Sequence, residues 1–345
     1  MLEKFFLLLL LKLPEEISHR VAIFLLKYSL VPPQKKVINS ITKFKFFNFK
    51  LTHPVGLAAG FDKNAEALPG LLKQNFSFIE VGTVTPLPQV GNSKPRVFRI
   101  LEEKSIINKL GFPNLGASKI FDNLYKVRKY HTLGLEPLIG VNIGCNKNTK
   151  NPIKDYEKCF EIFCSVADYI AINVSSPNTP GLRKLQLQNN LAPLLETLSD
   201  KREEYFKKNK RKIPLVLKIA PDLVDSDLKS IVKLIKSFQI EGIIATNTSI
   251  NKKIIENKKY TKLQGGISGN ALYKNSNNIL KKLQKISKGK ITLIGVGGID
   301  SGEKVFKKIK LGANAVQVYS SLIYNGISIV DNMVLDFIKL SKLNK

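Results

Sequence analysis

Short apolar runs recur along the chain from residue 54 onward, each ending at or beside a glycine or a hydrogen-bonding residue. They are Val55–Ala59, Phe78–Val81, Leu138–Asn142, Tyr169–Asn173, Leu215–Ile219, Gly242–Thr246, Thr292–Val296 and Ala315–Tyr319. Segments with helical periodicity separate most of them, for example Leu228 to Phe238 and Ile279 to Ile286. Strands that are apolar on both faces and alternate with helices are typical of a parallel sheet. Eight such units in about 290 residues predict an α/β protein with a (β/α)8 barrel.

A doubly wound open sheet is the alternative arrangement of such units. No G-x-G-x-x-G motif follows the first predicted strand, which weighs against a dinucleotide-binding open sheet. We therefore predict a barrel over residues 46–345 and a separate helical module over residues 1–45. The longest insertion, Pro86 to Gly116, lies between the second and third strands and is expected to cover a substrate.

The first 50 residues differ from the rest and predict two short helices. Residues 5–11 are continuously apolar, but a membrane span needs about 20 residues, and no small-residue cleavage site follows. In the next segment, Glu15 and Glu16 precede an apolar face, as in the first turn of an amphipathic helix. Nine Lys or Arg against three Asp or Glu in residues 1–50 suit a membrane interface. Membrane association and capping of the main domain both stay open.

The predicted strand ends share one property, since they hold glycines or hydrogen-bonding side chains. In chain order they supply Ala58-Ala59-Gly60-Phe61-Asp62-Lys63, Gly82-Thr83, Asn142, Asn173, Lys218, Thr246-Asn247-Thr248, Gly297-Gly298 and Tyr319-Ser320. A lone Asn at a strand end is more often a turn residue than a ligand. The carboxyl ends of barrel strands meet at one mouth, so the whole set predicts a binding site there.

The densest polar stretch is Asn173 to Gly181, which directly follows the fourth strand. It contains Ser175, Ser176, Asn178 and two prolines that stiffen the backbone. An ordinary polar loop, with Asn and Ser bonded to their own backbone, explains this stretch alone equally well. Its position at a barrel mouth favours a catalytic or binding loop.

Glycines near the last strands and a lysine in the middle of the mouth indicate the kind of ligand. The glycines are Gly265, Gly266, Gly269, Gly297 and Gly298, with Ser320 beside them. Loops after strands seven and eight commonly hold a phosphate in barrels. Neutral amides and hydroxyls with Lys218 suit a flat heterocycle such as a flavin, whose reduced form the lysine stabilises.

Several other activities are disfavoured by residue types that are missing from the expected places. None of the three histidines lies at a predicted strand end, which argues against a Ser-His-Asp hydrolase. The three cysteines, Cys145, Cys159 and Cys164, have no metal-ligand spacing and suit a reducing compartment, so we expect no metal site. The net charge of +28 would suit an anionic partner, but the lysines are scattered, which favours a compositional bias.

Five motifs together resemble dihydroorotate dehydrogenase of the class 2, quinone-reducing family. They are Gly56–Lys63, Lys94–Arg99, Asn108–Phe112, Asn142–Gly144 and Asn173–Arg183. The resemblance runs from the first helix to Tyr324. It implies oxidation of (S)-dihydroorotate to orotate in pyrimidine biosynthesis, with FMN as hydride acceptor and a quinone as final acceptor. A tRNA-dihydrouridine synthase is the rival enzyme, but that family uses a cysteine acid; a membrane scaffold would leave the strand ends unexplained.

The resemblance also implies residue roles. Ser176 would take the C5 proton of the substrate while hydride moves from C6 to flavin N5. Substrate would be held by Lys63, Asn108, Asn173, Asn178, Asn247 and Thr248, with the backbone of Lys109, Leu110, Gly111 and Phe112. FMN would be held by Ala59, Gly60, Thr83, Asn142, Asn173, Lys218, Thr246, Gly269, Gly298, Tyr319 and Ser320. The first helices would form the quinone entrance, with His19 and Arg99 nearby.

The identity of residue 176 separates the classes within the family. Soluble class 1 enzymes have cysteine at this position and lack the amino-terminal extension, whereas this chain has Ser176 and the extension. Two departures from the family pattern, Lys109 for the usual Arg and Ser321 for Gly or Ala, leave the expected activity unchanged. Class 2 membership implies a monomer on the cytoplasmic face of the cell membrane, with no nucleic-acid partner.

Overall fold

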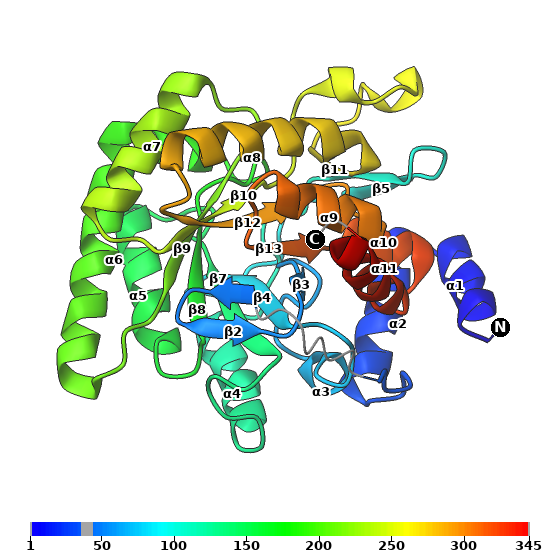
Figure 1. Cartoon of the computed structure of the whole chain (residues 1–345), viewed down its shortest axis with the longest axis horizontal. Helices are drawn as coiled ribbons and strands as arrows, with labels where there is room; N and C mark the ends of the chain where they lie inside the picture. The colour runs from blue at the N-terminus through cyan, green and yellow to red at the C-terminus, as the bar shows by residue number, and fades with distance from the viewer. Residues whose placement is uncertain (1, 36–43, 344–345) are drawn as a thin grey trace.

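The computed structural model describes residues 2–35 and 44–343, and eight parallel strands close into a barrel at its centre (Figure 1). The barrel strands are β3 (Val55–Leu57), β4 (Phe78–Val84), β7 (Leu138–Ile143), β8 (Tyr169–Asn173), β9 (Leu215–Ile219), β10 (Gly242–Ala245), β12 (Thr292–Val296) and β13 (Ala315–Val318). Each pairs with the next in chain order, and β13 pairs with β3 to close the ring. The prediction of a (β/α)8 barrel is confirmed, and the open-sheet alternative is wrong.

Predicted and observed strands differ only at their ends. β4 continues to Val84, three residues beyond its expected end, while β3, β10 and β13 stop slightly early. β3 stops because the chain turns into the mouth at Gly60, which has φ +99° and donates its N–H to the Gly82 carbonyl at 2.7 Å. β4 shifts register between Gly82 and Val84, a local irregularity that the hydrophobic pattern does not contain.

Helices surround the barrel, and most of them bury apolar side chains against the strands. They are α3 (Leu68–Leu71), α4 (Ala117–Arg128), α5 (Pro152–Phe163), α6 (Gln188–Asn209), α7 (Asp225–Ser237), α8 (Tyr273–Ser287), α9 (Gly302–Lys310), α10 (Ser320–Asn325) and α11 (Ile329–Leu343). α7 buries Leu228, Ile231, Val232 and Ile235, the spacing of a single helical face. Ser301 caps α9 by accepting a hydrogen bond from the Lys304 N–H at 3.3 Å.

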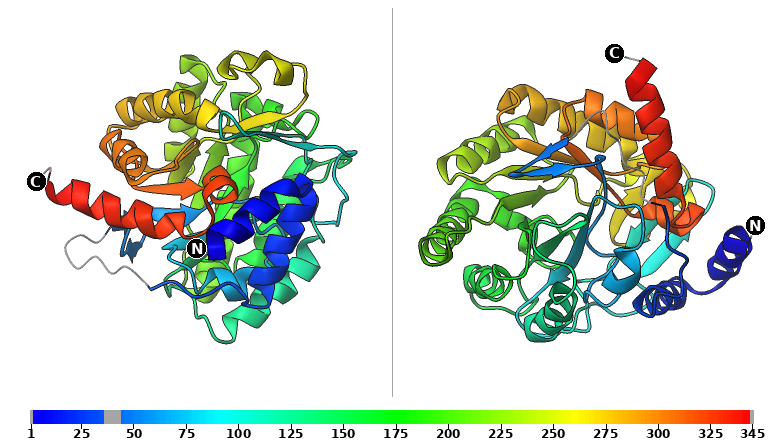
Figure 2. Two further views of the ribbon diagram at one scale, coloured as in Figure 1. Left: turned by 90° about the vertical axis from the view of Figure 1, so that its right-hand side faces the viewer. Right: turned by 60° about the horizontal axis from the view of Figure 1, so that its bottom comes forward.

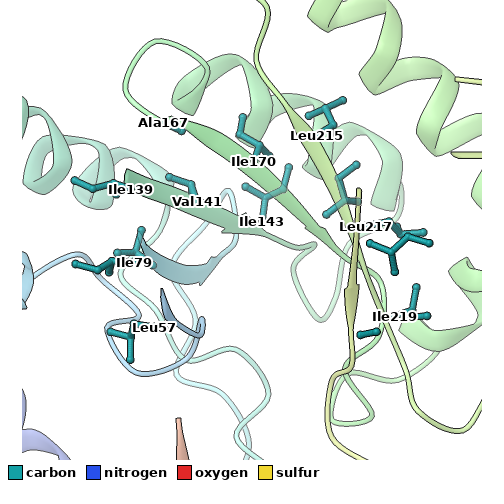
Figure 3. Packing of buried hydrophobic residues seen from close by; sticks show 14 of the residues in the cluster. Leu57, Ile79, Ile139, Val141, Ile143, Ala167, Ile170, Leu215, Leu217 and Ile219 are labelled. Carbon is teal, nitrogen blue, oxygen red and sulfur yellow. The ribbon is translucent and has the colours of Figure 1, made fainter. Parts of the chain in front are cut away.

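The main core lies between the barrel strands and the helices, as Figure 3 shows for β4, β7, β8 and β9. Ile139, Val141, Ile170 and Leu217 point outward from the strands into this layer and are fully buried. Burying each such side chain contributes about 1.5–3 kcal/mol. The apolar positions that predicted the strands are therefore the ones that hold the helices to the barrel.

A short hairpin plugs the amino-terminal end of the barrel, and the sequence pattern did not predict it. Its strands are β1 (Phe44–Phe46) and β2 (Phe49–Leu51). Phe46 and Leu51 are fully buried in a second core inside the barrel, where Phe46 lies 4.6 Å from the Phe78 ring, centroid to centroid. One end of the barrel is thus filled with aromatic side chains, which leaves the carboxyl ends of the strands as the open end.

The insertion between β4 and β7 forms part of a small sheet near the strands' carboxyl ends. β5 (Val97–Ile100) and β6 (Ser105–Asn108) pair antiparallel, and β6 also pairs with β11 (Gly266–Gly269). Ile107 and Ile267 bury themselves in a third, separate core beneath this sheet. The pairing joins segments about 160 residues apart and gives the insertion a fixed shape.

The amino-terminal segment forms two helices, as predicted: α1 (Leu2–Lys12) and α2 (Glu15–Lys27) (Figure 2). α2 packs against α3 and β5, and α1 lies beside α10. Glu16, an acidic residue in the first turn of α2, contacts the Arg96 guanidinium at 2.5 Å and so ties α2 to the insertion between β4 and β7. Among the described residues, no helix combines the length and the apolar character that crossing a membrane requires.

Candidate functional site

One cavity of about 1550 Å³ runs from the mouth of the barrel to the space between α1 and α2. It is walled by the strand ends, by the β5–β6 insertion and by apolar residues of the two helices, including Leu7, Leu10 and Ile23. All of the predicted site residues line it except Lys109 and Asn142. His19 and Arg99 lie in the same cavity wall as the strand-end residues. The structure therefore brings almost the whole predicted set to one place.

The two exceptions have other partners. The Lys109 backbone N–H donates to the Arg96 carbonyl at 2.8 Å, and its carbonyl accepts from Asn92 Nδ2 at 3.0 Å. Asn142 is fully buried behind Thr83, whose hydroxyl donates to Asn142 Oδ1 at 2.6 Å. Both residues shape the cavity wall from behind.

A chain of amides runs across the barrel mouth. Asn173 Nδ2 donates to Asn142 Oδ1 at 3.1 Å, and Asn173 Oδ1 accepts from Ser175 Oγ at 3.0 Å. Asn247 Nδ2 donates to Asn173 Oδ1 at 3.2 Å and to Ser175 Oγ at 2.9 Å. Each amide has a partner that fixes its orientation, so the cavity side of the chain presents a defined pattern of donors and acceptors.

Ser176 sits in the loop after β8 and is 5% exposed. Its hydroxyl oxygen accepts a hydrogen bond from the Asn178 N–H at 3.2 Å. Asn178 is itself fixed, because its Nδ2 donates to Asn108 Oδ1 at 3.1 Å and its carbonyl accepts from Asn92 Nδ2 at 3.0 Å. The loop is thereby held to the insertion on the opposite side of the cavity.

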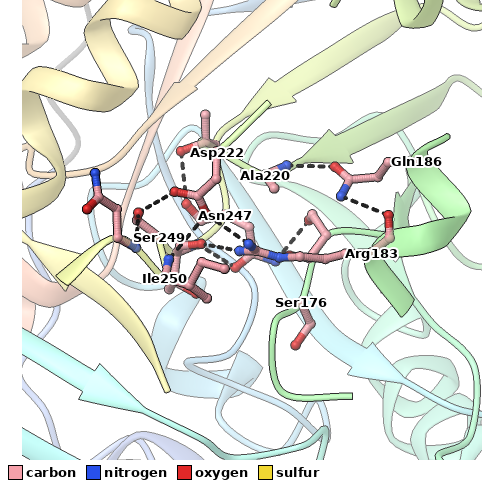
Figure 4. Close-up of polar contacts among 12 residues, drawn as sticks. Ser176, Arg183, Gln186, Ala220, Asp222, Asn247, Ser249 and Ile250 are labelled. Carbon is pink, nitrogen blue, oxygen red and sulfur yellow. Dashed lines mark hydrogen bonds and ion pairs between the residues drawn. The ribbon is translucent and has the colours of Figure 1, made fainter. Parts of the chain in front are cut away.

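Arg183 braces this loop from behind, a role that the sequence motif did not indicate (Figure 4). Its guanidinium donates to the Ser175 carbonyl at 3.0 Å and to the Thr248 carbonyl at 2.7 Å, and pairs with Asp222 at 2.8 Å. Asp222 also accepts from the Ile250 N–H at 3.2 Å. One arginine thus joins the loops that follow β8, β9 and β10.

Buried and half-buried ionisable groups lie at the end of the cavity nearest α2. Lys63 Nζ donates to the Gly60 carbonyl at 2.7 Å, and burial lowers the pKa of Lys63 to about 8. Burial raises the pKa of Asp62 to about 6 although its carboxylate accepts two backbone N–H groups. Burial and the neighbouring Lys63 charge lower the pKa of His19 to about 3. The His19 imidazole is therefore neutral at physiological pH, with its ring edge-on to Phe61.

Glycines form a concave wall at the last strand ends. Gly269, Gly297 and Gly298 have φ values of +87°, +109° and +70°, which L side chains rarely adopt. A Cβ on Gly298 would lie 2.5 Å from Tyr273 Cβ, so the backbone must approach closely here. Together with Ser320 these groups offer the exposed N–H donors that a phosphate needs.

Lys308 supports the glycine wall from within the protein. Its fully buried ammonium donates to Ser276 Oγ at 2.7 Å and to the Val296 carbonyl at 3.3 Å, while Ser276 Oγ donates to the Gly297 carbonyl at 3.2 Å. Burial lowers the pKa of Lys308 to about 7. The amphipathic pattern of α9 gave no signal for this residue, because surface lysines follow the same spacing.

The residues of the barrel mouth fit a flavin nucleotide. Gln317 Oε1 and Thr248 Oγ1 are buried atoms of cavity-lining residues, and neither has a hydrogen-bond partner among the described protein atoms. Unpartnered buried polar atoms cost free energy unless a ligand meets them. A flat ring with alternating donors and acceptors would meet Gln317 Oε1, and a second ligand beside the ring would meet Thr248 Oγ1. The glycine wall would then receive the phosphate of the nucleotide.

Comparison with known proteins agrees with this geometry. Residues 41–340 match the family model described as dihydroorotate dehydrogenase. A protein named dihydroorotate dehydrogenase (quinone) from Bartonella tribocorum is 41% identical over 336 residues, covering 96% of this chain and 90% of that protein. One of the same name from Aliivibrio fischeri is 44% identical over 287 residues, covering 83% of this chain and 84% of that protein.

Solved structures give the same result. The crystal structure of DHODH from Eimeria tenella in complex with ferulenol is 33% identical, with a TM-score of 0.90. The match covers 95% of this chain and 92% of that one. The ligand-free type of the same organism's DHODH matches with a TM-score of 0.90 over 96% of each chain. By its sequence, its barrel and the residues gathered at the barrel mouth, the chain belongs to the dihydroorotate dehydrogenase family.

Proposed function

We propose that the protein oxidises dihydroorotate to orotate, a step of pyrimidine biosynthesis, and passes the electrons to a quinone. The observation that carries this proposal is the continuity of the cavity. Ser176 and its asparagines lie at the barrel end, and an apolar passage leads from them to α1 and α2. The polar substrate would thus bind at the polar barrel end of this cavity, and the apolar acceptor would bind at its apolar end between α1 and α2.

The cofactor that fits the site is FMN. Ala59, Gly60, Thr83, Asn142, Asn173, Lys218, Thr246, Gly269, Gly298, Tyr319 and Ser320 would hold it, with the phosphate at the glycine wall and Asn142 acting through Thr83 and Asn173. When bound, FMN would supply the acceptor for the substrate hydride. Lys218 is buried in the cavity wall and would place a positive charge near the ring, which favours its reduced form.

Ser176 would act as the base that removes the substrate proton. Ser176 Oγ would take up the C5 proton while its own hydroxyl proton passes to solvent. The Asn178 N–H, which donates to this oxygen, would stabilise the negative charge that develops on it. Lys63 and Asn108 would hold the substrate carboxylate, while Asn173, Asn178, Asn247 and Thr248 would meet the pyrimidine edges. The backbone of residues 109–112 would contribute from the insertion, with Leu110, Gly111 and Phe112 in the cavity wall.

The helical module, which we assign to residues 1–45, would admit the quinone to the other end of the cavity. Neutral His19 and the charged Arg99 would be the polar groups near the quinone oxygens. The exposed apolar side chains of the two helices, together with Tyr28 directly after α2, would rest on the membrane surface; on the helices they are Phe6, Leu8, Leu9 and Phe24. We propose a monomer associated with the cytoplasmic face of the cell membrane, with residues 46–345 as the catalytic barrel.

An anaerobic two-step experiment tests this function. The purified protein, reconstituted with FMN, is mixed with dihydroorotate, and loss of the oxidised flavin absorbance is recorded. A quinone or NAD is then added to separate samples of the reduced protein. We expect bleaching, followed by reoxidation with quinone alone. A colourless protein, or flavin that stays oxidised with dihydroorotate, would contradict the proposal.

A further inference from the structure

A carboxylate lies inside the barrel, directly beneath the cavity. Glu80 comes from β4 and is fully buried, in the middle of a strand whose other residues are also buried. Its two oxygens receive hydrogen bonds from Asn142 Nδ2 at 2.8 Å, Gln317 Nε2 at 2.8 Å and the Tyr169 hydroxyl at 3.0 Å. Lys218 Nζ lies 3.9 Å from the same carboxylate. Four strands, β7, β8, β9 and β13, thus direct a donor at one acidic group.

This carboxylate dictates which way the neighbouring amides point. An ionised carboxylate only accepts hydrogen bonds, so Asn142 must turn its NH2 group toward Glu80 and its oxygen away. The Asn142 oxygen then accepts from Thr83 and from Asn173, and the Asn173 oxygen accepts from Asn247. The orientation set at Glu80 is passed along this chain to residues in the cavity wall.

Gln317 is oriented in the same way. Its NH2 group donates to Glu80, which leaves Oε1 as a buried acceptor that has no partner among the described residues. Gln317 lines the cavity, so this oxygen is available to a donor of a bound ligand. Glu80 therefore fixes the orientation of the amide chain and also the position of the Gln317 oxygen that faces the cavity.

The carboxylate also balances the charge of Lys218. Burial lowers the pKa of Lys218, and the Glu80 charge acts in the opposite direction. A buried cation with no counter-charge is costly, whereas the pair together is neutral. Lys218 can thus stay protonated next to the cavity without making the site strongly positive.

We propose that Glu80 is a positioning residue for the flavin, which keeps Lys218 charged and fixes the amide pattern that the ring meets. The proposal rests on the flavin assignment above. The proposal predicts a change in the reduction potential of the bound flavin. The negative charge of Glu80 near the ring repels the negative charge that reduction adds to the flavin. Removing the Glu80 charge while Lys218 stays protonated favours the reduced form.

The test is the midpoint potential of FMN bound to Glu80→Gln, measured by anaerobic dye equilibration from pH 6 to pH 9. At pH 6 we expect the variant to favour reduced over oxidised FMN at least tenfold more than the wild type, about 30 mV for a two-electron couple. The difference should shrink as pH rises, because Lys218 without its counter-charge loses its proton more easily. Equal potentials across the whole pH range would overturn the proposal.

Two further variants separate charge from shape. Tyr169→Phe removes one hydrogen bond from the Glu80 carboxylate but leaves its charge, so it should move the potential less than Glu80→Gln does. Glu80→Asp keeps the charge and should return the potential toward the wild-type value. If Glu80→Asp shifts the potential as far upward as Glu80→Gln, the effect comes from packing and the proposal fails.

A double variant covers the case in which the unpaired lysine prevents folding. Lys218→Met with Glu80→Gln replaces the ion pair by neutral groups, a change that buried pairs often tolerate. Compared with Lys218→Met alone, the double variant should have the higher potential; an equal or lower one would overturn the proposal. Bleaching of the wild type by dihydroorotate tests the proposed function separately, since it depends on Ser176 and does not require a changed potential.

Discussion

At the barrel end of the cavity, the polar side chains are fixed by hydrogen bonds to one another. At the helical end, apolar side chains form the wall, and arginine–glutamate pairs connect this wall to the insertion between β4 and β7. Asn173 and Asn247 belong to a buried network in which each amide has a fixed partner. The helical wall is tied to Arg96, just before β5, by Glu16 and to Arg99 of β5 by Glu15. The hydrogen-bonded amide network suits exact placement of a polar substrate, whereas the apolar wall tolerates a flexible apolar molecule.

This difference predicts that the two half-reactions can be damaged separately. Changes at the barrel end should slow reduction of the flavin by dihydroorotate, and changes at the helical end should slow its reoxidation by quinone. A variant at one end that impaired both steps equally would remove the distinction.

The largest separation is expected from Ser176→Ala. Loss of a general base slows the chemical step by about 10²–10⁴-fold, so stopped-flow reduction by dihydroorotate should slow by this factor while reoxidation by quinone is unchanged. Ser175→Ala is the matched control, because Ser175 is a neighbouring buried serine bonded to the amides. It loses two hydrogen bonds of about 0.5–1.5 kcal/mol each, so its effect should be at most about 150-fold, in the lower part of the range expected for Ser176→Ala. Equal rates for wild type and Ser176→Ala would exclude this serine as the base.

Acid should weaken the helical end through His19. Its pKa is about 3 in the folded protein and near 6.5 when unfolded, so between these values the unfolded state binds more protons. Stability is therefore lost as pH falls below about 6.5, by at most about 2 kcal/mol from this residue at pH 5. His19→Gln should lose less thermal stability between pH 7 and pH 5 than the wild type does. If both proteins have the same pH dependence of Tm, the imidazole is not held neutral.

The sequence was sufficient for the barrel because its strands are apolar on both faces, and this pattern has few alternatives. The strand-end residues followed, since closing the barrel gathers them at one mouth. Glu80 was missed because one acid inside the run Phe78–Val84 says nothing about the direction of its side chain. Its partners lie up to 237 positions away at Gln317, and no local signal connects them.

Elements that depend on distant partners were missed for the same reason. The β1–β2 hairpin has three-residue strands, and its stability comes from Phe78 and Tyr169 inside the barrel. β6 becomes a strand partly because it pairs with β11. Short strands are stabilised mainly by such contacts, so their own composition is a weak guide.

Two variants that each change an arginine-paired carboxylate to an amide compare the barrel end and the helical end of the cavity. Asp222→Asn weakens the Arg183 brace of the barrel-end loops, and Glu16→Gln weakens the Arg96 brace of α2. Both carboxylates are partly exposed, so solvent weakens their ion pairs and each substitution should cost less than the strongest charged hydrogen bonds do. We therefore expect each variant to slow the step that depends on it by about tenfold. Asp222→Asn should slow reduction by dihydroorotate, and Glu16→Gln should slow reoxidation by quinone. The rates of both half-reactions are measured for both variants. A slower reoxidation in Asp222→Asn, or a slower reduction in Glu16→Gln, would contradict the separation of the two ends.

Deleting residues 1–13 should give the smallest change and restrict it to the quinone. The deletion removes α1 with Leu7 and Leu10 from the cavity wall, but leaves the Glu16–Arg96 contact in place. Losing contact with roughly one leucine-sized group costs about 1.5 kcal/mol, so KM for a soluble quinone should rise by up to about tenfold. Reduction of the flavin by dihydroorotate should keep its wild-type rate, because every group around Ser176 remains. An unchanged KM for quinone would mean that α1 only covers the cavity, and that α2 and β5 alone form the wall which the acceptor touches.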